Sequence, residues 1–144
     1  MPGEHHLPAL LRHLSPVLDP QNYVFCTLPP EDSLPQSKLT PLATVLEPEG
    51  LSVVVPKAQA ESYPLGFEGT FRCIRLDVHS SLESVGLTAT VATALAREAI
   101  SANVIAGTFH DHILVPEQDA EAALRILHRL SEAASNSPAE DPIR

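Results

Sequence analysis

The chain has 144 residues, 44% of them apolar and 4% aromatic, and its 18 acidic and 9 basic side chains give a net charge of −9. This charge opposes phosphate backbones and anionic membranes, and few aromatic rings are present to stack on bases, so nucleic-acid and polyanion binding are disfavoured. No run of about 18 apolar residues marks a membrane span, and Met1 to Leu14 lacks the pattern of a signal peptide, so we expect a soluble, cytoplasmic protein.

Proline placement divides the predicted elements into two dissimilar halves, because eleven of the 14 prolines lie at or before Pro64. Helices in this first half must be short, since proline interrupts long helical runs. The expected elements, in chain order, are a short helix over Pro8 to Leu14, a strand over Tyr23 to Leu28, a loop over Pro29 to Pro41, and a hairpin of Thr44 to Glu47 and Leu51 to Val55 around Pro48-Glu49-Gly50.

The second half has a clearer pattern of strands and amphipathic helices. Phe71 to Val78 has the composition of a strand, and the slip of its apolar phase at Cys73-Ile74 predicts a bulge or burial on both faces. The elements that follow are a helix over Leu87 to Ala99, strands over Ser101 to Thr108 and His112 to Val115 joined by a turn at His110-Asp111, a helix opened by Pro116-Glu117, and a disordered tail over Ser131 to Arg144.

The order strand, helix, strand, strand, helix ends without a fourth strand. A three-stranded sheet of this kind has an open edge. The strand Tyr23 to Leu28 follows the short N-terminal helix, and our hypothesis is that it fills this edge and ties the two halves together.

Three segments carry a resemblance to a known family. The segments are Val78 to Ala89 (VHSSLESVGLTA), Ile100 to Gly107 (ISANVIAG) and His110 to Pro116 (HDHILVP). Their order and spacing resemble small stand-alone ACT-domain proteins, which are similar to the paired regulatory ACT domains of aspartate kinases. The resemblance is strongest over Phe71 to Leu130, and the first half, which includes Leu46 to Leu51, fits a degenerate module.

The resemblance implies an α+β fold of two tandem ferredoxin-like βαββαβ modules, with antiparallel sheets and helices on one face. The predicted modules cover residues 1–68 and 69–132, followed by a disordered tail over residues 133–144. It further implies a regulatory protein rather than an enzyme, with no cofactor, that binds a small molecule such as an amino acid and forms a homodimer, and a regulated enzyme is a candidate partner. A ligand of such modules sits between the loop after the first strand and a facing module.

The residues of this loop suit an amino-acid ligand. Ser84 to Thr88 precede or begin a helix, whose first N–H groups attract a carboxylate, and Gly86 lets a ligand approach the backbone. Hydroxyl groups of Ser80, Ser81 and Thr88 are further donors. The predicted ligand-binding residues are Ser80, Ser81, Val85, Gly86, Leu87, Thr88, Asn103, Val104 and Ile105, with Asp111, Glu47 and Glu49 as alternative acceptors for an ammonium group.

Several residues of this region also have a purely structural interpretation. The serines are common helix-capping and turn residues, Gly86 permits a turn, Val85 and Leu87 fit a core, and Asn103 can satisfy its own backbone.

Two other functions compete with ligand sensing. An interaction protein that kept the fold and lost the pocket is the first. The second is a small metal enzyme that uses His110 and His112, which share a face if they lie on one strand, with His79 as a third ligand. Cys26 and Cys73 have no CxxC partner and are expected to be buried, inert thiols.

Overall fold

The structure, a computed structural model, describes residues 3–28, 39–63 and 65–136. By its contacts the chain divides into two units. Unit 1 comprises the described residues of Met1–Asp19 and Cys73–Arg144, and unit 2 comprises those of Pro20–Arg72. Strand β1 (Pro16–Leu28) contributes to both units, because the division falls between Asp19 and Pro20.

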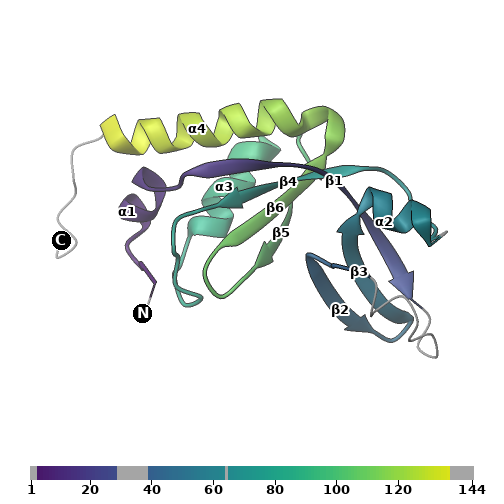
Figure 1. The fold of residues 1–144 in the computed structure, drawn as a ribbon. Coiled ribbons are helices and arrows are strands. Elements are labelled where there is room, and N and C mark those ends of the chain that lie inside the picture. Colours follow the sequence, from purple (N-terminus) through teal and green to yellow (C-terminus); the bar gives the residue numbers. More distant parts are fainter. Residues whose placement is uncertain (1–2, 29–38, 64, 137–144) are drawn as a thin grey trace. The chain divides into compact units, whose positions relative to one another are not determined.

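Unit 1 contains three α-helices and parts or all of four strands. Its elements are α1 (Leu7–Arg12), the start of β1, β4 (Phe71–Leu76), α3 (Leu87–Ala96), β5 (Asn103–Ala106), β6 (Asp111–Pro116), the 3-10 turn η2 (Glu117–Asp119) and α4 (Ala120–Asn136). The strands lie in the order β1-β4-β6-β5 (Figure 1). This is the strand order of a ferredoxin-like βαββαβ module whose fourth strand comes from the N-terminal part of the chain.

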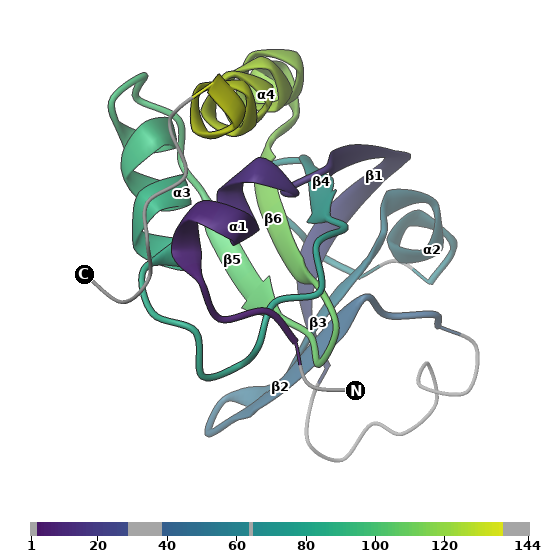
Figure 2. The ribbon, with the colours of Figure 1, turned by 90° about the vertical axis from the view of Figure 1, so that its left-hand side faces the viewer.

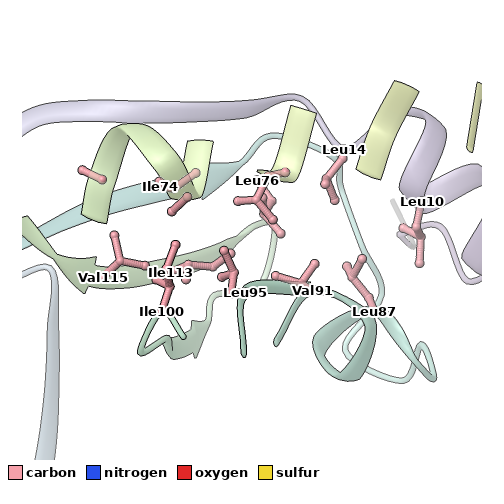
Figure 3. Packing of buried hydrophobic residues seen from close by; sticks show 13 residues of the cluster. Leu10, Leu14, Ile74, Leu76, Leu87, Val91, Leu95, Ile100, Ile113 and Val115 are labelled. Carbon is pink, nitrogen blue, oxygen red and sulfur yellow. The ribbon is translucent and has the colours of Figure 1, made fainter. Parts of the chain in front are cut away.

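The core of unit 1 lies between one face of these strands and the helices. Ile74 and Leu76 alternate along β4, Ile113 and Val115 alternate along β6, and all four are buried. The helices add Leu10 from α1, Leu87, Val91 and Leu95 from α3, and Ala123 and Leu127 from α4, as Figure 3 shows for most of them. Figure 2 shows α1 in front of β6, with α3 beside it and α4 above.

Strand β4 is buried on both faces at Cys73 and Ile74, as the slip of apolar phase predicts. The fourth strand is also present, but its residues differ from the prediction. Pro16–Asp19 belongs to unit 1, whereas Tyr23–Leu28 pairs with Leu51–Pro56 of β3 in unit 2, so the hypothesis for Tyr23 to Leu28 was wrong. Strand β1 begins seven residues before the predicted start at Tyr23, and it includes Pro16 and Pro20, a residue type that propensity disfavours within strands.

Unit 2 is a smaller antiparallel sheet with one short helix. The order β2 (Ala43–Glu47), β3 (Gly50–Pro56), β1 confirms the predicted hairpin. Its core combines side chains from β1 and β3 with Ala60 of α2 (Lys57–Ser62), a helix that the sequence did not predict. Most of the predicted loop Pro29 to Pro41 lies outside the described residues.

The α+β fold of antiparallel strands and helices is confirmed. Helix α4 continues to Asn136, so the predictions of a disordered tail from Ser131 or from residue 133 placed its start too early. Residues 137–144 lie outside the described part of the chain. Ala133 and Ala134 favour helix continuation over the disorder that the polar composition indicated. Within residues 3–28, 39–63 and 65–136, no helix is long and apolar enough to cross a membrane.

The grouping of contacts predicts that a fragment of residues 69–144 will not fold alone. It lacks Leu10 and Leu14, which are fully buried in the core of unit 1. Removal of one buried leucine side chain costs about 2–5 kcal/mol, and a domain of this size is stable by only about 5–15 kcal/mol. Circular dichroism should show an unfolded fragment, and a peptide of residues 1–28 added in trans should restore helical signal. A stably folded fragment would support the sequence division at residue 68 as a physical boundary.

Candidate ligand-binding site

The N-terminus of helix α3 has no side-chain cap. Its N-cap residue is Gly86, with φ of 102°, and no side chain accepts a hydrogen bond from the first turn there. The Thr90 N–H and hydroxyl groups both donate to the Gly86 carbonyl, at 2.9 Å and 2.7 Å. The N–H groups of Leu87, Thr88 and Ala89 therefore have no acceptor inside the helix, and they carry the positive end of the helix dipole.

This helix end forms part of the wall of a cavity of about 120 Å³ within unit 1. The rest of the wall comes from the loop between β4 and α3, the last residue of β5 and the first residue of β6. The residues that line the cavity are Ser80, Ser81, Leu82, Ser84, Gly86, Leu87, Thr88, Ala106 and Asp111. Because most of these groups are polar, the cavity suits a small polar ligand.

Asp111 places a carboxylate in this cavity. Burial raises the pKa of its side chain above the ordinary value of 3.8, while the positive charge of His112, a hydrogen bond from the Ser80 hydroxyl and the charge of His110 act in the opposite direction. Ser80 is itself only 6% exposed. A half-buried carboxylate that its surroundings do not neutralise favours a cationic partner.

The serines of the loop have separate structural roles. The Ser81 hydroxyl accepts a hydrogen bond from the Glu83 N–H at 3.1 Å, and the Ser84 N–H donates to the Ser81 carbonyl at 3.1 Å. Ser81 thus caps a turn of the loop and leaves the start of α3 free. Helix capping by these serines, the structural alternative that the sequence left open, does not occur at α3.

Six of the twelve predicted ligand-binding residues meet at the cavity: Ser80, Ser81, Gly86, Leu87, Thr88 and Asp111. Leu87 serves the core as well, since only 3% of it is exposed. Val85 is 84% exposed, does not line the cavity and is not part of the core, so the structural interpretation that placed it there was wrong.

The remaining predicted residues lie elsewhere. Asn103, Val104 and Ile105 lie on β5 and do not line the cavity, and the Asn103 amide donates to the Leu114 carbonyl at 3.4 Å. Glu47 and Glu49 belong to the β2–β3 hairpin of unit 2, where the Glu47 carboxylate accepts a hydrogen bond from the Ser52 hydroxyl.

Sequence reasoning missed Leu82, Ser84 and Ala106 as lining residues. Leu82 and Ser84 belong to the same loop as Ser80 and Ser81, so their position beside the helix start was the available signal. No pattern marked Ala106, because its place at the cavity depends on where β5 ends.

The competing metal-enzyme hypothesis requires His110 and His112 to share a face, with His79 as a third ligand. His110 lies before β6, with its Nδ1 3.4 Å from the Val78 carbonyl oxygen, whereas His112 lies within β6, where its side chain points to the opposite face from that of its neighbour Asp111. The ring of His79 lies 5.2 Å from that of Phe109. Among the described residues, no group of three or more His, Cys, Asp or Glu side chains is placed to hold a metal ion.

Comparison with known proteins gives two adjacent family matches. A family model described as an ACT domain matches residues 2–73, and a second, also described as an ACT domain, matches residues 68–129. No match was found among curated proteins.

Solved structures with a similar fold include a protein of unknown function and regulatory subunits of aspartate kinases. A Vibrio cholerae protein of unknown function, described as a possible transport protein, is 46% identical with a TM-score of 0.78, over 87% of this chain and 95% of that one. The Agrobacterium tumefaciens protein Atu0741 is 18% identical (TM-score 0.62; 77% and 84% covered). The ligand-free regulatory subunit of Thermus thermophilus aspartate kinase is 13% identical (TM-score 0.62; 82% and 97% covered).

The backbone at Gly86 predicts that Gly86→Ala destabilises the protein. A Cβ there would lie 3.1 Å from Leu7 Cδ2, and the positive φ is strained for alanine, at a cost of about 1–3 kcal/mol. The control is Gly66→Ala, since no atom lies within 4 Å of a Cβ at that position. Urea denaturation should show a lower midpoint for the first variant only, and equal midpoints would contradict the assigned strain.

The environment of the thiols predicts that neither cysteine reacts in the native protein. Cys26 and Cys73 are free and buried, and burial raises both pKa values, that of Cys73 to about 11. Because the thiolate is the reactive form, a thiol reagent such as DTNB at about pH 8 should label no thiol until urea unfolds the chain, and then two. Rapid labelling of Cys73 in the folded protein would contradict its placement in the core.

Proposed function

The chain belongs to the ACT-domain family, and we propose that it is a regulatory protein that binds a compact amino acid in the cavity at the start of α3. One observation carries this proposal. The same small cavity contains the uncapped N-terminus of a helix, which attracts an anion, and the half-buried Asp111 carboxylate, which attracts a cation. The zwitterion of an amino acid has both charged groups attached to the same Cα.

The ligand carboxylate accepts hydrogen bonds from the free N–H groups of the first turn of α3. Thr88 adds a hydroxyl group on the same wall. Charge-assisted hydrogen bonds of this kind are about twice as strong as neutral ones.

The ligand ammonium group binds Asp111, oriented by the Ser80 hydroxyl. Asp111 is preferred over Glu47 and Glu49 because it is the acidic residue that lines this cavity. An ammonium ion beside Asp111 stabilises its ionised form and so offsets part of the desolvation that raises its pKa. Ligand binding and ionisation of Asp111 therefore favour each other.

The size of the cavity limits the ligand. At about 120 Å³ it is smaller than the range of about 300–1,000 Å³ typical of drug-sized ligands. We therefore favour an amino acid with a short side chain, or one whose side chain leaves through the mouth beside Leu82.

In this proposal the ligand regulates by changing how modules or subunits pack together, and not through a chemical reaction. A ligand shifts a protein between arrangements only as far as it binds one of them better than the other. Regulatory subunits of aspartate kinases share the fold, which supports a role beside a regulated enzyme. We propose a cytoplasmic homodimer that is not itself an enzyme.

A thermal-shift screen of the twenty L-amino acids tests the proposal. A ligand present at about 100 times its Kd stabilises the folded state by about 2.7 kcal/mol, which raises the Tm by several degrees. At least one compact amino acid should give this rise, and its amine and its carboxylic acid analogues should not. The absence of a rise with all twenty would contradict amino-acid binding.

Asp111→Asn should weaken binding of the amino acid found in that screen by about ten- to a hundredfold, because a charge-assisted hydrogen bond is lost. It should not lower the Tm of the unliganded protein, since the neutral amide is less costly to bury than the carboxylate. The matched control is Glu132→Gln, which removes a charge from the exposed face of α4. Unchanged affinity in titration calorimetry would remove Asp111 from the site.

The pKa of Asp111 also sets the pH dependence of binding. The ammonium group needs the ionised carboxylate, and the pKa of this carboxyl is raised, so affinity should be constant near neutral pH. It should fall as the pH is lowered through that raised pKa, which lies above the ordinary aspartate value of 3.8. Asp111→Asn should abolish this dependence, and a rise in affinity on acidification would contradict the assignment.

A protein-interaction role is the alternative function. Leu82, Val85 and Phe109 are 67%, 84% and 59% exposed, and exposed apolar side chains favour contact with another protein. In that case Leu82→Ser with Val85→Ser would remove the regulatory effect in the cell, whereas Asp111→Asn would leave it unchanged.

A further inference from the structure

The N-terminal segment Gly3–Leu7 lies directly against the loop that forms the cavity. The Glu4 N–H donates to the His79 carbonyl at 2.8 Å, and the Ser81 N–H donates to the Glu4 carbonyl at 2.9 Å. These two hydrogen bonds pair Glu4 with Ser80 in parallel, as a short bridge outside the main sheet. The backbone of Ser80–Ser81 is thus held by residues almost 80 positions away in the sequence.

Glycine at position 3 is what permits this approach. A Cβ there would lie 2.6 Å from both the Ser80 carbonyl carbon and the Ser81 nitrogen, and these backbone atoms cannot rotate away as a side chain does. Any larger residue must therefore move the N-terminal segment or the loop.

The segment also contacts the start of helix α3. Leu7 Cδ2 would lie 3.1 Å from a Cβ at Gly86, so the Leu7 side chain fills the space that the glycine leaves. Between these contacts, the Glu4 carboxylate accepts hydrogen bonds from the N–H groups of His5 and His6, each at 2.9 Å, and so fixes the turn into α1.

We propose that Gly3–Leu7 is a positioning clamp for the ligand-binding loop, an inference that rests on the proposed function. None of these residues lines the cavity. The clamp acts through Ser80, Ser81 and Gly86, which do line it, and holds their backbone in the geometry that the ligand requires.

A clamp of this kind is coupled to the ligand in both directions. If docking of the segment raises affinity for the ligand, then bound ligand must stabilise docking by the same factor. Occupancy of the cavity is thereby transmitted to α1 and to the start of β1, since the chain runs directly from Leu7 through α1 into β1.

Gly3→Ala tests the clamp, because its Cβ displaces the segment without changing a residue of the cavity. Two controls are needed. Gly66→Ala makes the same chemical change in open space, and Leu127→Ala lowers stability through a buried core position on α4, a helix that does not line the cavity. The probe is the L-amino acid that gives the largest rise in Tm of the unaltered protein, added to each variant in titration calorimetry.

Gly3→Ala should weaken binding about fivefold or more, in the range usual for coupling between sites. Leu127→Ala should lower the Tm while leaving the affinity of the folded protein unchanged, and Gly66→Ala should alter neither. Equal affinity for Gly3→Ala and the unaltered protein would overturn the proposal, because the segment would then be a structural contact only.

Hydrogen exchange of the ligand-free protein provides a separate readout. The Ser81 amide should exchange faster in Gly3→Ala, since its acceptor is the Glu4 carbonyl, and unchanged exchange would also overturn the clamp. If no amino acid binds the unaltered protein, the proposed function fails, and the exchange result by itself decides whether the segment holds the loop.

Discussion

The proposed ligand site depends on one electrostatic arrangement, in which the uncapped N-terminus of α3 and the Asp111 carboxylate share one cavity. Gly86 makes the arrangement possible, because its positive φ starts the helix without a capping side chain. Ser81 accepts a hydrogen bond from the Glu83 N–H in its own turn, and no serine side chain caps α3. Leu87 and Thr88 of the first turn line the cavity, and so does Asp111 of strand β6.

The N-terminal part of the chain supports this site through the core, the sheet and the loop. Leu10 and Leu14 are buried in the core on which α3 packs, and Pro16–Asp19 is a strand of the same unit. The segment Gly3–Leu7 then reaches the loop itself. A single stretch of about 17 residues thus contributes to the core, the sheet and the backbone of the site, which explains why unit 1 is not contiguous in sequence.

The sequence predicted most elements of unit 1 and six of the nine residues that line the proposed site. Local signals were sufficient where the cause is local: the apolar stripe of α3, the burial of Cys73 and Ile74, and the residues around Gly86. The predictions were wrong where contacts between residues far apart in the sequence determine the structure. Strand β1 contains prolines, and its first residues, which belong to unit 1, were not predicted as a strand. Val85 is apolar like a core residue, but its side chain is exposed on the loop.

The histidines illustrate the same limit. His110 and His112 have the spacing of two residues on one strand face, but β6 begins only at Asp111. The alternation of side chains holds only within a strand, so whether His110 and His112 share a face depends on whether the strand includes both, and sequence alone does not determine where it starts. Asp111, one of three alternative acceptors in the sequence, is the acidic residue that lines the cavity.

The most direct measurement of the central claim is a titration of ¹⁵N-labelled protein with each compact L-amino acid, followed by the amide signals of the first turn of α3. A carboxylate bound there should shift the Leu87, Thr88 and Ala89 amide protons downfield, as expected for new hydrogen bonds to an anion. The same titration with the corresponding amine, which lacks the carboxylate, should not shift them. Saturable binding that leaves these three signals unmoved would contradict the account, because the ligand would then lie elsewhere.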